Sequence, residues 1–115
     1  MGYLAHRTIV CTTWCKESIK KAHDKSISVF IDPDNPNRKL VSEILDTGMN
    51  STCSFFIAPD GSKEGWAMSD LYDEKRASFI EWIHSNDPNF HLDYVEVRFG
   101  GDQPDKSKIE STNYN

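Results

Sequence analysis

Seven residues of this chain have side chains suited to holding a small anionic ligand. A strand is expected to give way to a helix at residues 12–14, and the free N–H groups and positive dipole end of a helix N-terminus favour an anion such as phosphate. A tryptophan ring could stack on a base, while arginine or lysine could pair with phosphate oxygens. The candidate ligand residues are Arg7, Thr12, Thr13, Trp14, Lys63, Trp66 and Arg98.

Several of these candidates also have a purely structural interpretation. Trp66 could fill the core, Trp14 could pack in the first turn of a helix, and Arg98 could form an ion pair on a strand. The sequence pattern contains no paired carboxylates and no nucleophile–base pair, which acid–base or covalent catalysis would require. The residues therefore favour capture of a ligand over its cleavage, and they indicate no catalytic residue and no cofactor.

The cysteines do not match a metal-binding pattern. Three residues separate Cys11 from Cys15, whereas zinc sites usually combine a closer pair with a second matching pair. The four histidines share no spacing, so we expect no metal site. Since the three cysteines cannot all pair within one chain and no export signal is visible, reduced thiols in a cytosol are expected.

Length and charge narrow the possible partners. The 115 residues fit one domain, and 18 acidic against 13 basic residues give a net charge of −5. This balance argues against general nucleic-acid binding, which depends on neutralising phosphates. No apolar run approaches the roughly 20 residues that span a bilayer, so no membrane partner is expected.

The hydrophobic pattern predicts an alternation of strands and helices. Strands are expected over residues 6–12, 53–58 and 92–99, and a further strand through Trp66 is expected to form a hairpin with the second of these. The turn at residues 59–62 contains Asp-Gly, which suits a tight hairpin. Helical spacing predicts helices from about residue 14 to 30 and from about 70 to 84, with a shorter helix over 39–45.

The order strand, helix, strand, strand, helix, strand predicts an α+β fold of the ferredoxin-like split βαβ type. Such a fold has a four-stranded antiparallel sheet with two helices on one face. We expect residues 1–100 to form this single domain and residues 101–115 to form a polar C-terminal tail. In the last strand, Val95, Val97 and Phe99 are expected to face the core. The free face of the sheet would present aromatic residues, among them Phe56 or Trp66 and Tyr94, and would bind a partner.

Four stretches of the chain resemble small uncharacterised accessory proteins of tailed bacteriophages. The first is the run Ser54-Phe55-Phe56-Ile57-Ala58-Pro59-Asp60-Gly61-Ser62-Lys63-Glu64-Gly65-Trp66. The others are Phe79-Ile80-Glu81-Trp82 with Asp93-Tyr94-Val95-Glu96-Val97, and the opening Leu4-Ala5-His6-Arg7-Thr8-Ile9-Val10. The resemblance spans roughly residues 3–101 and carries over no catalytic residues. It implies a phage protein in the cytoplasm of an infected bacterium, with interference in host defence as its expected role.

Together these observations favour a non-enzymatic, self-associating protein that sequesters a small nucleotide-like signal. One alternative is an acidic inhibitor or DNA mimic that binds a host protein through Asp70, Asp73, Glu74 and Glu81. Another is a small enzyme of the dimeric ferredoxin-like barrel type. The enzyme alternative requires a pocket under the sheet that contains His6 or His91 together with a carboxylate.

Overall fold

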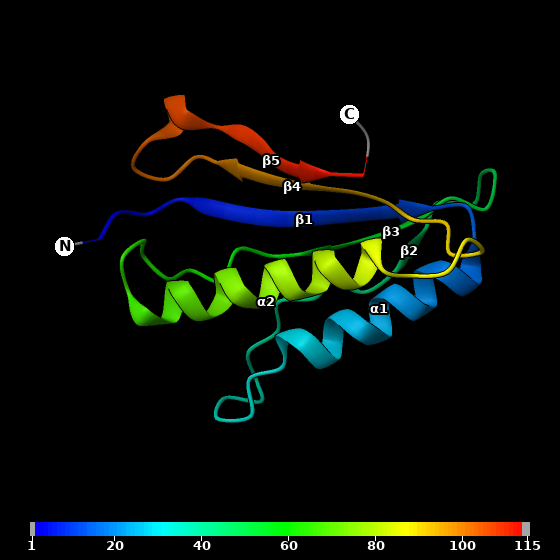
Figure 1. Ribbon diagram of the computed structural model, residues 1–115, viewed down its shortest axis with the longest axis horizontal. Helices are drawn as coiled ribbons and strands as arrows, with labels where there is room; N and C mark the ends of the chain where they lie inside the picture. Colours follow the sequence, from blue (N-terminus) through cyan, green and yellow to red (C-terminus); the bar gives the residue numbers. More distant parts are fainter. Residues whose placement is uncertain (1, 114–115) are drawn as a thin grey trace.

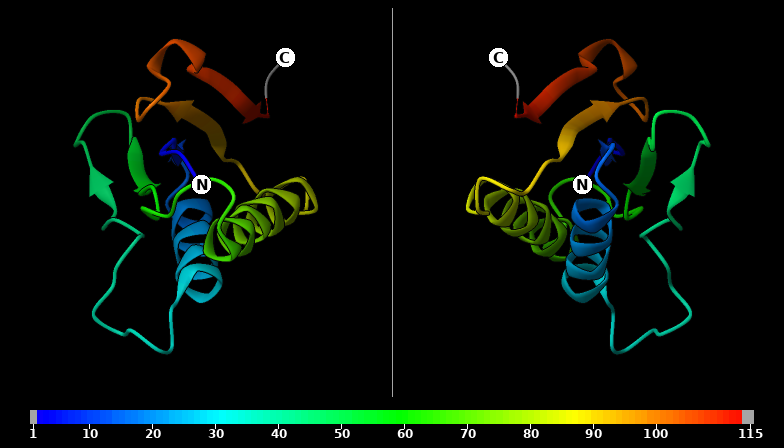
Figure 2. Two further views of the ribbon diagram at one scale, coloured as in Figure 1. Left: turned by 90° about the vertical axis from the view of Figure 1, so that its left-hand side faces the viewer. Right: turned by 90° about the vertical axis from the view of Figure 1, so that its right-hand side faces the viewer.

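In the computed structural model, which describes residues 2–113, two α-helices lie on one face of a five-stranded antiparallel sheet (Figures 1 and 2). The strands have the spatial order β2-β3-β1-β4-β5. Their bounds are β1 (His6–Thr13), β2 (Leu45–Asp46), β3 (Cys53–Ile57), β4 (Asp93–Phe99) and β5 (Lys108–Thr112). The helices are α1 (Lys16–Phe30) and α2 (Ala67–His84), with a short 3-10 helix η1 (Pro104–Lys106) before β5. The α+β class with two helices is confirmed, whereas the predicted count of four strands is wrong.

β1 is the central strand and pairs with β3 on one side and β4 on the other. Ile9 and Cys11 are fully buried on the helix side, while Val10 is exposed on the opposite face. The same alternation holds in β3, where Phe55 is buried and Phe56 is exposed. The predicted faces of these two strands are therefore confirmed.

Within residues 2–113, no helix has both the length and the apolar character needed to cross a bilayer.

The predicted hairpin at residues 59–62 and the predicted strand through Trp66 are wrong. After β3 the chain forms a loop that leads directly into α2, and Trp66 is the residue before that helix. The Asp60 carboxylate anchors the loop, because it accepts a hydrogen bond from the Ser62 N–H (3.2 Å) and pairs with Arg76 of α2 (3.1 Å). Gly61 has the positive φ that a tight turn needs (87°). The ion pair with α2 nevertheless directs the chain towards the helix.

The outer edge of β3 is covered by residues 40–46 in an extended conformation. Val41 forms an isolated bridge with Ile57, and Leu45 of β2 pairs with Ser54. The predicted short helix over residues 39–45 is therefore wrong. The backbone N–H and C=O groups of this segment form hydrogen bonds to β3 instead. A short apolar run can form a strand as readily as a helix.

α1 begins slightly later than predicted. It is preceded by Cys15, which has an extended conformation (φ −95°, ψ 108°). The Thr13 hydroxyl accepts a hydrogen bond from the Cys15 N–H (3.1 Å), outside the helix itself. Local side-chain-to-backbone bonds of this kind compete with helix capping, so the turn at residues 12–14 is separated from the first helical residue.

β4 faces the helices with the side opposite to the one predicted. Tyr94 is buried, and its hydroxyl lies 2.7 Å from Nε2 of His84 at the end of α2. Glu96 is the cross-strand neighbour of Ile9 and therefore also lies on the helix side. The predicted core residues Val95, Val97 and Phe99 consequently lie on the open side of the sheet. Polar and apolar residues alternate strictly in β4 and so define its two faces. The polar face is turned towards the helices because Tyr94 and Glu96 find partners there, in His84 and Arg76.

The polar tail predicted for residues 101–115 differs from the structure. Residues 108–112 form β5, an edge strand that pairs with β4 after a bulge between Glu96 and Val97. Ile109 is the only large apolar residue in this strand, which explains why the hydrophobic pattern gave no signal. Residues 114 and 115 lie outside the described part of the chain.

Candidate functional site

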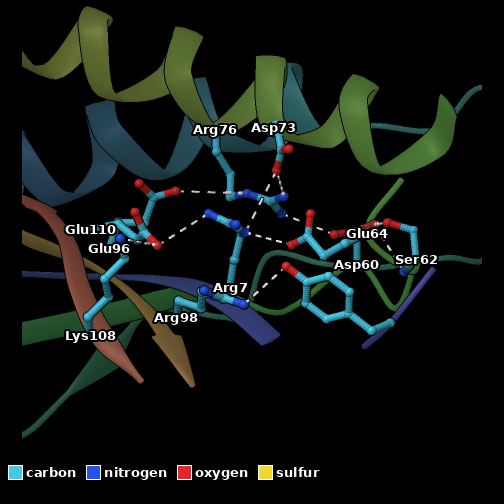
Figure 3. A network of polar contacts seen from close by, with 11 residues as sticks. Arg7, Asp60, Ser62, Glu64, Asp73, Arg76, Glu96, Arg98, Lys108 and Glu110 are labelled. Carbon is cyan, nitrogen blue, oxygen red and sulfur yellow. Dashed lines mark hydrogen bonds and ion pairs between the residues drawn. The ribbon is translucent and has the colours of Figure 1, made fainter. Parts of the chain in front are cut away.

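A network of charged side chains lies between the sheet and α2 (Figure 3). β1 contributes Arg7, α2 contributes Asp73 and Arg76, and the loop before α2 contributes Asp60 and Glu64. The strands β4 and β5 supply Glu96, Arg98, Lys108 and Glu110. β1, the loop with α2, and β4 with β5 are far apart in sequence, and they bring their charges to one region of the fold.

Arg76 is the buried centre of this network, with 3% of its side chain exposed. Its guanidinium donates to Oδ1 of Asp73 (2.6 Å) and Oδ1 of Asp60 (3.1 Å). Its Nε lies 3.8 Å from Oε2 of Glu96 and makes no hydrogen bond. A buried arginine requires such carboxylates, since an unpaired buried charge is strongly destabilising.

The two buried carboxylates beside Arg76 respond to it in opposite ways. Burial opposes ionisation of Asp60, but hydrogen bonds from Ser62 and the charge of Arg76 outweigh it and lower the pKa of Asp60. Burial raises the pKa of Glu96, and the more distant charges of Arg76 and Arg7 offset this only in part. The difference follows from contact geometry, because Asp60 is hydrogen-bonded to Arg76 and Glu96 is not.

Arg7 links the loop before α2 to β5. Its Nε lies 3.0 Å from Oε1 of Glu64, and its Nη1 lies 3.5 Å from Oε1 of Glu110. Burial disfavours its charge, but Glu64, Asp73 and Glu110 prevail and raise the pKa of Arg7. Arg7 is therefore held as a structural cation between acidic neighbours.

Arg98 differs from Arg7 and Arg76, because no carboxylate of the described chain lies within 4.0 Å of its guanidinium. Its cross-strand neighbours are both basic, Arg7 in β1 and Lys108 in β5. Like charges directly opposite each other on a sheet repel. The guanidinium contacts Tyr3, with Nη2 3.3 Å from the hydroxyl and the charge 5.8 Å from the ring centre.

Lys63 and Trp66 lie in the loop that passes beside Tyr3. The Glu64 N–H donates to the Tyr3 carbonyl (2.8 Å), which holds this loop against the N-terminal segment. The Lys63 ammonium lies 5.9 Å from the centre of the Trp66 ring, and half of Trp66 is exposed. The structure thus brings four of the predicted ligand residues, Arg7, Lys63, Trp66 and Arg98, to one end of the sheet.

The other three predicted ligand residues lie at the opposite end of β1. Trp14 follows Arg7 by seven positions of extended chain, a distance of roughly 23 Å. The Thr12 hydroxyl lies 2.8 Å from that of Ser54, and the ring of exposed Trp14 stacks on His91 with centres 5.0 Å apart. The seven predicted residues therefore form two separate groups and not one site.

The cysteines are all free. Burial raises the pKa of the Cys11 thiol to about 12. Hydrogen bonds from the side chain and backbone of Ser18 lower the pKa of the Cys15 thiol. Among residues 2–113, no group of three or more histidine, cysteine or acidic side chains is placed to hold a metal ion.

Three pockets lie away from the charged network. One of about 320 Å³ runs between α1 and residues 36–43, with Ile27 and Leu40 among its lining residues. A second, of about 430 Å³, lies on the open side of the sheet beside Phe56, and a third, of about 140 Å³, lies at Phe90. None of the seven predicted ligand residues lines these three pockets.

Sequence reasoning missed most members of the charged network. These are Tyr3, Asp60, Ser62, Glu64, Arg76, Glu96, Lys108 and Glu110. The sequence contains one indication of this network, because Arg76 falls on the apolar stripe of its helix between Tyr72 and Phe79. A basic residue in such a position indicates buried acidic partners.

No family model, no curated protein and no solved structure matches this chain.

Proposed function

We propose that this chain is a non-enzymatic binding protein that captures a small nucleotide-like anion at the end of the sheet where Arg98 and Trp66 lie. The observation that carries the proposal is the setting of Arg98, which stands between Arg7 and Lys108 with no carboxylate within 4.0 Å among the described residues. Glu110 already pairs with Arg7 (3.5 Å) and Lys108 (3.9 Å), which leaves Arg98 as the member of this row without a carboxylate. An anion bound there would accept charge-assisted hydrogen bonds from the Arg98 guanidinium.

Trp66 and Lys63 extend this site towards a ligand with an aromatic base. The half-exposed Trp66 ring offers a surface for stacking, and Lys63 beside it supplies a second positive charge. Arg7 contributes less directly, because Glu64 and Glu110 already pair with it. In this proposal Arg98 binds phosphate oxygens and Trp66 stacks on the base.

The biological role that we propose follows the resemblance to phage accessory proteins. In the cytoplasm of an infected bacterium, such a protein would interfere with host defence by sequestering a nucleotide-like signal. We also propose that the fold is a ferredoxin-like arrangement extended by one edge strand. The strand order β2-β3-β1-β4, with a helix after β1 and another after β3, supports this assignment.

The two alternatives have less support from the geometry. Of the acidic residues proposed for a protein inhibitor, Asp73 is hydrogen-bonded to Arg76, which leaves the exposed Asp70, Glu74 and Glu81. For the enzyme, His6 contacts the ring of Phe99 and His91 stacks on Trp14. Neither histidine lines one of the three pockets.

Isothermal titration calorimetry tests the proposal with three probes: ADP, cyclic di-AMP and inorganic pyrophosphate. We expect at least one nucleotide to bind, and Arg98→Gln to weaken it by roughly tenfold to a hundredfold, because one charge-assisted hydrogen bond contributes about 1.5–3 kcal/mol. Lys106→Gln is the matched control, since exposed Lys106 lies in η1 outside the row. Binding by none of the probes, or equal weakening by both variants, would contradict the proposal.

A second pair of variants tests the stacking residue. Trp66→Ala should reduce nucleotide binding and leave pyrophosphate binding unchanged, because only the nucleotide has a base to stack. Trp14→Ala is the control, as Trp14 is similarly exposed but lies at the other end of β1. Loss of nucleotide binding in Trp14→Ala with retention in Trp66→Ala would assign the ligand to the other end of the sheet.

A further inference from the structure

One side of the sheet is turned away from α1 and α2 (Figure 2), and the register of the strands places few charged residues on it. We call this side the open face. It comprises His6, Thr8, Val10, Thr12, Leu45, Ser54, Phe56, Val95, Val97, Phe99, Ile109 and Thr112, with Asp93 at one end. Aspartate, glutamate, lysine and arginine make up 27% of the chain, so their near absence from this face does not reflect composition.

The apolar side chains of the open face lie next to one another across the strands. Phe56, Val10 and Val95 are direct cross-strand neighbours on β3, β1 and β4. Val97 and Ile109 continue the apolar surface onto β5. Phe56 is 47% exposed and Ile109 is 65% exposed. An apolar surface that crosses four strands without a covering layer is typical of an interface.

We propose that a second copy of this chain docks on the open face and forms a two-fold dimer. The five strands contain 8, 2, 5, 7 and 5 residues, 27 in all. With a strand spacing of about 4.8 Å and a rise of about 3.3 Å per residue, they present roughly 430 Å² of projected area, to which side-chain relief adds. Two such faces approach the lower limit of the roughly 1,200–2,000 Å² that specific interfaces bury.

The distribution of charge favours an identical partner over a different protein. Each copy has a net charge of −5, but most ionic groups of β1, β4 and β5 lie on the helix side, as Arg7, Glu96 and Glu110 illustrate. The acidic residues on the open side are Asp93 at one end of β4 and Glu43 beside Phe56, so few like charges meet when two open faces pack together. A charged partner would find almost no complementary charge on this face, and complementary charge is the usual source of specificity between different proteins.

The dimer and the proposed ligand site use opposite sides of the sheet. Arg98 lies on the helix side with Glu96, while the dimer would bury Val10 and Phe56. Self-association and ligand binding can therefore fail independently in experiments.

Light scattering coupled to size exclusion tests the dimer. We expect the wild type at twice the 13.2 kDa mass of one chain, and Phe56→Glu at the mass of one chain, because a buried carboxylate without a partner prevents association. Leu71→Glu is the matched control, since Leu71 lies on α2 with 45% exposure against 47% for Phe56. Ile109→Glu, on the edge strand β5, keeps the test valid if Phe56→Glu disturbs folding, which circular dichroism would reveal.

Conversion of both open-face variants to single chains, with Leu71→Glu still dimeric, would support the proposal. A wild type with the mass of one chain would overturn it. A dimer that survives both open-face substitutions would overturn it as well, because association would then use another surface.

Discussion

Replacing Asp60 by Asn should destabilise this protein strongly. The Asp60 side chain is 8% exposed and pairs with Arg76, which is 3% exposed. Its carboxylate also accepts hydrogen bonds from the Ser62 N–H and hydroxyl. The substitution retains the size of the side chain but removes the charge that compensates Arg76.

The magnitude follows from the burial of this pair. Removing one partner of a buried ion pair costs about 3–5 kcal/mol. We place Asp60→Asn at the lower end, about 3 kcal/mol, because Asp73 remains bonded to Arg76. With an unfolding entropy of about 2.1 cal/mol/K per residue over 115 residues, this corresponds to a fall in Tm of about 12 °C.

The assay is urea denaturation at pH 7, with Asp24→Asn as the control. Asp24 pairs with Lys20 on the surface of α1 and is 63% exposed, so its loss should cost about 0.3–0.5 kcal/mol. Equal costs in free energy of unfolding for the two variants would refute the reasoning.

The pH dependence of stability gives a second check. Because the folded pKa of Asp60 is lowered, its contribution is present above the unfolded pKa of 3.8 and is lost as the pH falls through the folded value. The difference in the free energy of unfolding between wild type and Asp60→Asn should therefore narrow as the pH falls below 3.8.

Three further predictions follow from the same structure. Glu96→Gln should leave the urea midpoint at pH 7 unchanged or slightly higher, because burial raises the pKa of Glu96 so that its ionised form costs stability above pH 4.5, and Arg76 keeps its bonds to Asp60 and Asp73; a loss as large as that of Asp60→Asn would contradict this. Iodoacetamide at neutral pH should label Cys15 before Cys11, since hydrogen bonds from Ser18 lower the pKa of the Cys15 thiol while burial raises that of Cys11 to about 12; peptide mass spectrometry reports the order, and equal rates would be inconsistent with the fold. Tyr94→Phe should cost about 1–2 kcal/mol in urea denaturation, because its hydroxyl bonds both α2 and β5; a neutral result would mean that these bonds do not contribute.

The sequence predicted correctly which face of β1 and of β3 is buried, but not that of β4, whose residues alternate most sharply in polarity. In β1, Ile9 and Cys11 are buried as expected, while Val10 on the opposite face is exposed. The alternation failed in β4, where both faces carry large side chains and the buried face contains Tyr94, with a hydroxyl. Periodicity separates the two faces of a strand, but partners elsewhere in the fold decide which one is buried.

The predicted hairpin failed for a reason that lies in tertiary contacts. Asp60-Gly61 has the local chemistry of a hairpin turn, and Gly61 does take a positive φ. The decisive interaction joins Asp60 to Arg76, sixteen residues later. Such a pair is not visible in local sequence, although a basic residue on an apolar helical stripe was a usable indication.

The candidate site was predicted in part. The seven candidate ligand residues are of types that suit anion binding. The fold gathers four of them, Arg7, Lys63, Trp66 and Arg98, at one end of the sheet. The turn at residues 12–14 lies at the other end of β1 because an extended strand carries its two termini far apart. Which of the basic residues lack acidic partners depends on the cross-strand register, which the sequence does not specify.

The most direct test of ligand capture is native mass spectrometry of the protein purified from bacteria with an active nucleotide-signalling defence. We predict that the wild type and Lys106→Gln retain additional mass in the nucleotide range, and that Arg98→Gln loses it. A wild type without added mass, or added mass that Arg98→Gln retains in full, would contradict the account.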